Sequence, residues 1–213
     1  MALLEIHDLH TFFKTKKGIV KAVNGVSYSV EPGKTLGVVG ESGSGKSVSA
    51  MSILKLLDGN GYIDSGEIIF DGKNLADVSV KDMCKIRGNE ISVIFQEPMT
   101  SLNPTKKAGV QVDEIVRLHT DLEKEKRYEK VLETFQAVGL KDAKKVYDSY
   151  PHQLSGGMRQ RVMIAMAVIL HPDLIIADEP TTALDVTIQT QIVELLKDIN
   201  KSEQNAMLFI THD

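Results

Sequence analysis

The 213-residue sequence predicts an α/β fold, with a parallel sheet as its core and antiparallel strands and a helical segment beside it. Residues 174–177 form a short, continuously apolar run, which is typical of a parallel strand buried on both faces. Residues 66–73 carry an Asp-Gly pair within an apolar stretch, which predicts an antiparallel hairpin. From residue 110 to about residue 150, apolar residues recur at helical spacing among charged ones, which predicts a helical lobe.

A glycine-rich stretch is the strongest chemical signal. Residues 40–47 read Gly-Glu-Ser-Gly-Ser-Gly-Lys-Ser, between a predicted strand at 35–39 and a predicted helix that begins near Lys46 and runs to residue 57. This matches the phosphate-loop pattern, in which glycines leave backbone N–H groups free for an anion, the lysine reaches the β- and γ-phosphates and the serine binds Mg²⁺. A flexible Gly/Ser turn is the alternative, and the flanking strand and helix argue against it. The predicted nucleotide contacts are Gly40, Ser42, Gly43, Ser44, Gly45, Lys46, Ser47 and Val48.

An acidic pair follows the buried strand at 174–177. Asp178 and Glu179 would lie at the carboxyl end of that strand, where Asp178 can hold Mg²⁺ and Glu179 can polarise an attacking water. Read alone, such a pair is a surface turn about as often as it is a functional site. Its combination with the phosphate loop predicts a site that hydrolyses a nucleoside triphosphate.

Composition narrows the class of protein. Apolar content of 42% and charged content of 25% are ordinary globular values, and the net charge of −4 comes without a basic tail, which favours partners other than nucleic acid. Cys84 is the single cysteine, which excludes an intrachain disulfide, and we expect it to be structural. The amino terminus does not have the pattern of a signal peptide, and no stretch approaches the roughly 20 apolar residues of a membrane-spanning helix.

Residues 154–158, Leu-Ser-Gly-Gly-Met, open a predicted helix that runs to about residue 170, with Ser155 as its N-cap. With this motif, the phosphate loop and the acidic pair, the chain resembles the nucleotide-binding subunits of ABC transporters, from Phe13 to His212. The resemblance implies a P-loop NTPase (RecA-like) core with an antiparallel β subdomain, at 1–98 and 166–213, and an inserted α-helical subdomain at 99–165.

The resemblance also implies roles for single residues. Gln96 would contact Mg²⁺ and the attacking water, and His212 would sense the γ-phosphate. Asp185 ends the motif at 183–185, which lies near the nucleotide. Phe13 would stack on adenine, with Phe12 as the alternative. Each has a plainer interpretation: a loop amide for Gln96, a helix N-cap for Asp185 and an isolated histidine for His212.

The resemblance implies ATP as the nucleotide, Mg²⁺ as the metal and head-to-tail dimers that enclose two ATP molecules. Ser155, Gly156 and Gly157 would then serve the nucleotide of the opposite subunit, which is a similar or identical ABC ATPase. Transmembrane permease subunits would dock near residues 96–104, and an extracytoplasmic solute-binding protein would act on them. The expected location is the cytoplasmic face of a prokaryotic membrane.

A finer likeness lies in residues 95–104, 152–161 and 177–186, which are similar to the oligopeptide/dipeptide importer group, including nickel importers. Members of that group usually continue beyond the histidine that corresponds to His212. The resemblance therefore implies that the chain, ending at residue 213, is a fragment. A soluble ABC ATPase of DNA repair or translation is the main alternative. A nucleotide-binding regulatory module is less favoured, since it would be expected to lack Glu179 or His212.

Overall fold

The computed structural model describes residues 2–182 and 184–212. Its strands are β1 (Leu4–Thr15), β2 (Gly18–Val30), β3 (Thr35–Val39), β4 (Gly61–Phe70), β5 (Lys73–Asn74), β6 (Ile91–Ile94), β7 (Leu174–Asp178) and β8 (Ala206–Thr211). Its α-helices are α1 (Lys46–Ile53), α2 (Val80–Ile86), α3 (Pro98–Ser101), α4 (Ala108–His119), α5 (Lys124–Ala137), α6 (Ala143–Asp148), α7 (Gly156–Val168) and α8 (Val186–Glu203). Short 3₁₀ turns occupy Leu75–Asp77 and Pro151–Gln153.

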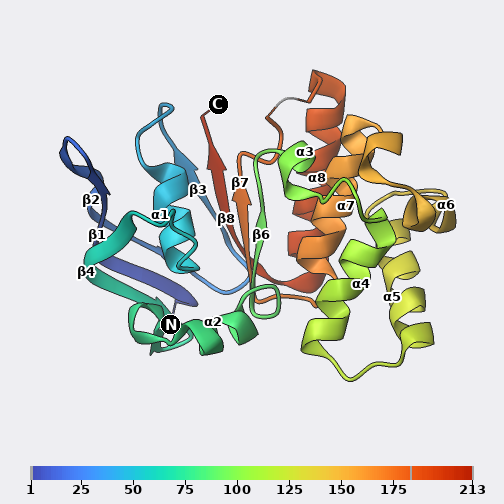
Figure 1. The fold of residues 1–213 in the computed structure, drawn as a ribbon, viewed down its shortest axis with the longest axis horizontal. Helices are drawn as coiled ribbons and strands as arrows, with labels where there is room; N and C mark the ends of the chain where they lie inside the picture. The colour runs from blue at the N-terminus through green and yellow to red at the C-terminus, as the bar shows by residue number, and fades with distance from the viewer. Residues whose placement is uncertain (1, 183, 213) are drawn as a thin grey trace.

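Two four-stranded sheets form the frame. The parallel sheet has the order β3-β8-β7-β6, and the antiparallel sheet has the order β2-β1-β4-β5. Helix α1 lies between the two sheets, whereas α3 to α8 gather on the other side of the parallel sheet (Figure 1). This arrangement confirms the predicted α/β class, with antiparallel strands and a helical part beside a parallel core.

The parallel sheet positions the site. All five residues of β7 are buried, as the continuous apolar run predicted, because helices cover one face and α1 with the antiparallel sheet covers the other. The carboxyl ends of β3, β8, β7 and β6 all point to the upper edge in Figure 1. Side chains that directly follow these strands are therefore brought together at one edge.

The predicted hairpin at 66–73 is confirmed. Strand β4 turns into β5 through Asp71 and Gly72, which have φ values of 45° and 75°. Two successive positive φ angles are typical of a tight turn whose twist matches the twist of the paired strands. Strand β4 begins earlier than the hairpin pattern indicated, at Gly61.

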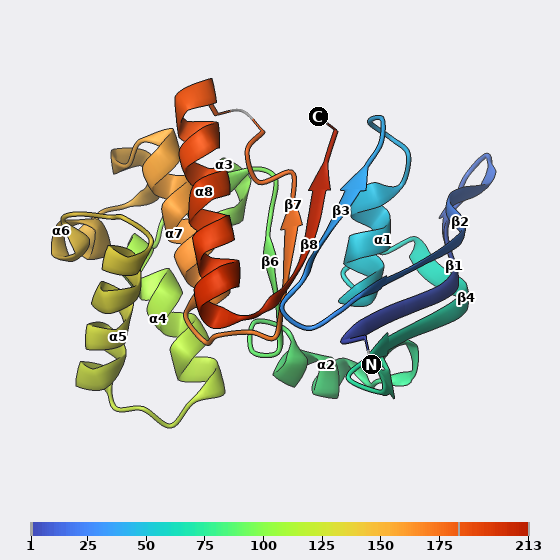
Figure 2. The same cartoon turned by 180° about the vertical axis from the view of Figure 1, so that it is seen from behind.

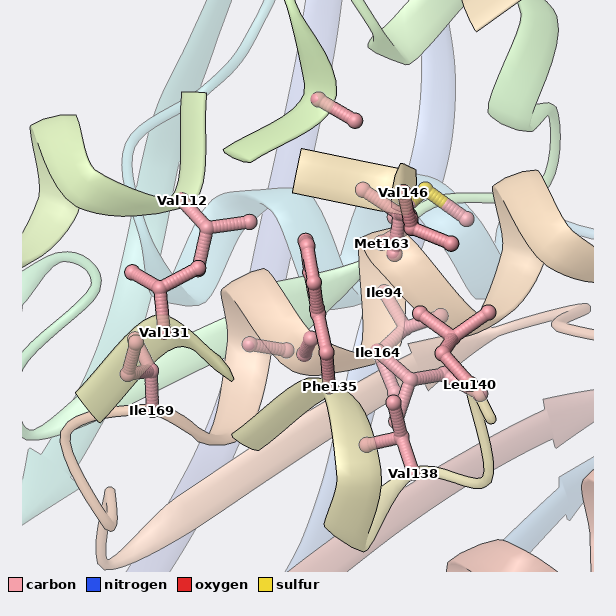
Figure 3. Close-up of a cluster of buried hydrophobic side chains, with 14 of the residues drawn as sticks. Ile94, Val112, Val131, Phe135, Val138, Leu140, Val146, Met163, Ile164 and Ile169 are labelled. Atoms are coloured by element: carbon pink, nitrogen blue, oxygen red, sulfur yellow. The ribbon is translucent and has the colours of Figure 1, made fainter. Parts of the chain in front are cut away.

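Buried apolar side chains form two clusters, one on each face of the parallel sheet. The cluster on the helical side joins α4, α5, α6 and α7 to the sheet through Ile94, Ile175 and Met207. Figure 3 shows the fully buried Phe135 ring standing in the middle of this cluster. The view from behind in Figure 2 shows α8 beside α7 on the same side, away from the antiparallel sheet.

Helix α7 starts in the predicted helical subdomain and continues past residue 165, and its apolar side chains belong to the cluster that contacts the sheet. The helical part thus shares one continuous core with the sheet. The division of the chain at residues 98/99 and 165/166 stays a prediction.

Two predicted boundaries were wrong. Helix α1 ends at Ile53 and not at residue 57, because Lys55 adopts a left-handed φ of 51° and its ammonium group donates to the carbonyls of Ala76 and Val78. Two prolines among the nine residues 96–104 predict a loop there, but the stretch contains the single turn α3. There the Glu97 carbonyl accepts hydrogen bonds from the backbone and hydroxyl of Ser101, which close the helical turn.

Candidate active site

A cavity of about 430 Å³ opens at the edge where the parallel strands end. Its walls come from the loop after β3, the start of α1, and the segments that follow β6, β7 and β8. The cavity thus collects most of the predicted phosphate loop, together with Gln96, Glu179 and His212, from four places in the sequence. Three contacts predicted in the phosphate loop and the acidic pair do not line it: Gly40, Ser44 and Asp178. It is lined by Ala22, Ser42, Gly43, Gly45, Lys46, Ser47, Val48, Gln96, Glu179, Thr182 and His212.

The phosphate loop requires glycine for two separate reasons. Gly43 and Gly45 have φ values of 81° and 90°, which side chains rarely adopt. A Cβ atom on Gly45 would also lie 2.2 Å from the carbonyl oxygen of Ala22 in β2. Helix α1 begins immediately afterwards, so its free N–H groups and the positive end of its dipole lie at the loop.

Lys46 is a buried cation at the start of α1, with 9% of its surface exposed. Its ammonium nitrogen donates to the carbonyls of Gly40 at 2.6 Å and Glu41 at 2.9 Å. These carbonyls are neutral, and burial of a charge is costly unless a counter-charge compensates it. An anion in the cavity would supply that charge, which fits a phosphate group.

Ser47 and Asp178 bring two oxygen atoms together. The Ser47 hydroxyl donates to the Asp178 Oδ1 atom at 2.8 Å, although the two residues lie 131 positions apart. Burial raises the pKa of Asp178 above its usual range and Glu179 adds to the rise, whereas the Ser47 hydroxyl and Lys46 oppose it. A hydroxyl and a carboxylate oxygen are ligands that Mg²⁺ accepts, together with water and phosphate oxygens. The residues present therefore fit a magnesium ion.

The Glu179 carboxylate is the meeting point of the site. Its Oε2 atom accepts hydrogen bonds from Gln96 Nε2 at 3.0 Å, Thr182 Oγ1 at 3.1 Å and His212 Nδ1 at 3.1 Å. An ionised carboxylate can only accept, so this geometry assigns the proton of the neutral histidine to Nδ1. The backbone of Glu179 has a φ of 45°, an uncommon value for a residue with a side chain.

Thr182 and Ala22 are site residues that sequence reasoning missed. Thr182 donates to Glu179 from only three positions further along the chain, and the turn that brings it there has no sequence pattern of its own. Ala22 is a small residue in the middle of a strand and contributes a carbonyl. The one available signal was the Thr-Thr pair directly after the acidic motif.

The residues of the 154–158 motif lie outside the cavity. Ser155 caps α7 by accepting from the Met158 N–H at 3.3 Å, which confirms the predicted N-cap. Gly157 packs closely on α8, where an added Cβ atom would lie 3.2 Å from Ile188. Roles for Ser155, Gly156 and Gly157 toward a nucleotide stay predictions.

Asp185 also lies outside the cavity. It caps α8 by accepting from the Ile188 N–H at 3.0 Å, as its plainer interpretation expected. Its role toward a nucleotide stays a prediction, and residue 183 of the same motif lies outside the described residues.

Neither candidate for adenine stacking lines the cavity. Phe12 is buried, with its ring edge-on to Tyr62 and the Lys21 ammonium 5.4 Å from the ring centre. The ring of Phe13 lies against Gly61, where an added Cβ atom would come within 2.7 Å of it. The choice between Phe12 and Phe13 stays open.

The parallel sheet, the glycine-rich loop and the acidic strand end define a P-loop NTPase domain. Residues 23–182 match the ABC transporter family, and the chain belongs to that family. No helix in the described part of the chain has the length and apolar character needed to span a membrane.

Two named relatives of the chain are ATP-binding proteins of peptide transport. The chain is 51% identical to the oligopeptide transport ATP-binding protein OppD of Bacillus subtilis (strain 168), over 99% of this chain and 59% of that protein. It is 48% identical to the dipeptide transport ATP-binding protein DppD of Lactococcus lactis, over 99% of this chain and 61% of the relative. The chain thus spans about six-tenths of the length of these relatives.

Solved structures share the fold. The ATP-binding cassette MJ0796, in a dimeric post-hydrolysis state bound to ADP and Pi, aligns with a TM-score of 0.87 and 29% identity, over 99% of this chain and 88% of that one. The protein cbiO1 from Clostridium perfringens, part of the ABC transporter complex cbiONQ, aligns with a TM-score of 0.81 and 26% identity, over 100% of this chain and 79% of that one.

The raised pKa of Asp178 gives a prediction about stability. A carboxyl whose pKa is higher in the folded chain than in the unfolded chain lowers the free energy of unfolding as the pH rises through that interval, and its cost is complete above the folded pKa. Asp178→Asn removes the charge and keeps an oxygen that can accept from Ser47. We therefore expect the variant to melt at a higher temperature than the unsubstituted chain near about pH 8, and the difference to shrink toward about pH 4.

Circular dichroism melts across that range measure the difference. Asp64→Asn, at an exposed position in β4, is the control and should change stability by no more than about 0.5 kcal/mol. The account would be contradicted if Asp178→Asn melted below the unsubstituted chain near neutral pH and the difference in melting temperature did not shrink in acid. Burial of this charge would then not be the dominant effect.

Proposed function

We propose that the chain is the ATP-binding and ATP-hydrolysing part of a subunit that powers an ABC importer for oligopeptides, dipeptides or a related solute. The observation that carries the proposal is the Glu179 carboxylate, held at the phosphate-loop cavity by donors from three segments. The relatives named as oligopeptide and dipeptide transport ATP-binding proteins support the peptide class of cargo.

ATP would bind with its phosphates on the loop. The N–H groups of residues 43 and 45–47 and the Lys46 ammonium would face the β- and γ-phosphates. The Ser44 N–H already donates to the Glu41 carbonyl. Ser47, Asp178 and the amide oxygen of Gln96 would hold Mg²⁺, which when bound neutralises charge on the phosphates. The chain supplies these groups on three different strand ends, so the nucleotide is held by the sheet edge and not by the loop alone.

Glu179 would orient and polarise the attacking water. Its hydrogen bonds from described residues all fall on Oε2, which leaves Oε1 to accept a proton from water. Gln96, Thr182 and His212 fix the direction of the carboxylate before the nucleotide arrives. The second nitrogen of His212, Nε2, would donate to the γ-phosphate once it also carries a proton, because phosphate oxygens accept hydrogen bonds.

One chain supplies half of the complete site. The cavity of a chain is not lined by its own signature residues, Ser155, Gly156 and Gly157, or by its own Asp185. We propose that these residues complete the site of a second, similar or identical cassette. The dimeric arrangement of MJ0796 supports this proposal. Subunit closure would then require two ATP molecules, one at each shared site.

A second cavity, of about 320 Å³, suits the transmembrane subunits. It lies beside β6 and α4, and its walls are mostly apolar, with Leu56, Phe95 and Leu118 exposed by 40%, 39% and 69%. Arg87, Ser92, Ser101 and His119 are its polar members. Exposed apolar side chains around a hollow are typical of a protein docking site. Phe95 directly precedes Gln96, so a permease segment seated here would act on the residue that contacts Glu179.

Such docking would put the subunit at a membrane, and we propose the cytoplasmic face of a prokaryotic membrane. Residues 99–165 would be the subdomain that carries residues 155–157 to the partner cassette. An extracytoplasmic solute-binding protein would deliver the cargo to the permease. The choice of cargo therefore rests with those subunits.

Substitution of the proposed base tests the function. Glu179→Gln keeps the size of the side chain and removes the carboxylate, so we expect the rate of ATP hydrolysis to fall about 10²- to 10⁴-fold while ATP binding persists. Steady-state release of phosphate and fluorescence titration with a labelled ATP measure the two effects. Glu194→Gln, at an exposed position of α8, should leave both unchanged. Unchanged hydrolysis by the Glu179 variant would refute the proposed role.

If the permease docks at this cavity, a substitution there should weaken binding of the transmembrane subunits without changing ATP hydrolysis. Leu118→Glu places a charge at the apolar cavity, so we expect co-purification with the transmembrane subunits to drop at least about 10-fold, because a buried unpaired charge costs several kcal/mol. ATP hydrolysis by the isolated chain should stay normal. Val80→Glu, on α2 and 71% exposed outside this cavity, is the matched control. Normal co-purification of the Leu118 variant would exclude this cavity as the docking site.

A further inference from the structure

A buried side-chain amide links α7 to the turn that carries Glu179. Because α7 begins within the motif at 154–158, we call it the signature helix. Gln160 lies in α7, five residues after Ser155, and is only 1% exposed. Its Nε2 atom donates to the carbonyl oxygen of Pro180 at 2.7 Å. A carbonyl can only accept, so this contact fixes which end of the amide faces the turn. The other end, Oε1, is buried without a hydrogen-bond partner among the described residues.

The turn at 179–182 needs such support. Glu179 holds a left-handed φ of 45°, which costs free energy and persists only where surrounding contacts enforce it. The Glu179 N–H donates to Ile210 in β8, and the Glu179 carbonyl accepts from Thr182. Proline has no N–H, so the carbonyl is the one backbone hydrogen-bonding group of Pro180, and Gln160 occupies it.

Packing alone does not account for this glutamine. A methionine has a similar length and would fill the same space without a buried, unpaired oxygen. Burial of such an oxygen opposes folding unless another gain offsets it. The hydrogen bond to the Pro180 carbonyl is the gain that the structure offers.

We infer that Gln160 is a positioning residue, which fixes the direction of the Glu179 carboxylate by anchoring the Pro180 carbonyl to α7. The inference rests on the proposed function of Glu179. It gives the signature helix a direct mechanical link to the active site of its own chain. When Ser155 and Gly156 engage the nucleotide of the partner, a shift of α7 would reach Glu179 through the hydrogen bond from Gln160 to Pro180.

Gln160→Met tests the inference, with Gln111→Met as the matched control. Gln111 is also a buried glutamine, 6% exposed, whose Nε2 atom donates to two carbonyls, those of Asn103 and Lys106. It makes these contacts within the helical part, away from Glu179. The control therefore loses at least as much buried hydrogen bonding as the test variant.

Two measurements on the full chain give the readout. Hydrogen–deuterium exchange at the amides of residues 179, 181 and 182 should become roughly tenfold faster in Gln160→Met, because the turn opens more often. The kcat for ATP hydrolysis should fall on the order of 10-fold with the KM for ATP unchanged, because the carboxylate is displaced while the phosphate loop is intact. Gln111→Met should change neither quantity.

Unchanged exchange at the turn in Gln160→Met would overturn the inference, as would an equal effect of Gln111→Met. If the unsubstituted chain hydrolyses no ATP, the proposed function fails, and the exchange measurement still decides whether Gln160 anchors the turn. Faster exchange confined to residues 179–182 then supports the anchor, and unchanged exchange refutes it.

Discussion

Four parallel strands end at one edge of the central sheet, and everything that the site does depends on this geometry. The phosphate loop follows β3, Gln96 follows β6, Asp178 and Glu179 end β7, and His212 follows β8. Since the strands are hydrogen-bonded to one another, the side chains after them are held at fixed separations. The Glu179 Oε2 atom, with its three donors, is the point where the segments that follow β6, β7 and β8 meet.

The site is prepared for a ligand at a cost to the fold. Lys46 is buried against neutral carbonyls, Asp178 is buried enough to raise its pKa, and Glu179 holds an unfavourable backbone conformation. A bound Mg-ATP would bring negative charge to Lys46 and a cation to Asp178, in addition to the attraction between these two residues. Stability given up at a functional site in this way is a common feature of enzymes. The apolar cavity beside Phe95 lies next to the same network, so docking of a partner there can act on Glu179 through Gln96.

The sequence was most informative where chemistry and local conformation coincide. The phosphate loop, the acidic strand end and the Ser155 cap are local patterns, and the structure has each of them where it was predicted. Sequence reasoning missed Thr182, because its contact with Glu179 depends on a turn held by other parts of the fold. The early end of α1 was missed for the same reason, since the Lys55 side chain binds carbonyls more than 20 residues away. Side-chain contacts of that kind have no periodicity to read.

On the proposed function, one chain carries two halves of different sites, which only a second cassette completes. The most direct test is light scattering of the Glu179→Gln chain with and without Mg-ATP, alone and mixed with a similar cassette, since slowed hydrolysis should trap a closed pair. We expect a monomer without nucleotide and a doubling of mass with ATP. A second substitution, Gly157→Glu, should abolish the dimer without affecting ATP binding. The shared-site account would be contradicted if the chain, saturated with ATP, stayed monomeric both alone and when mixed with a similar cassette.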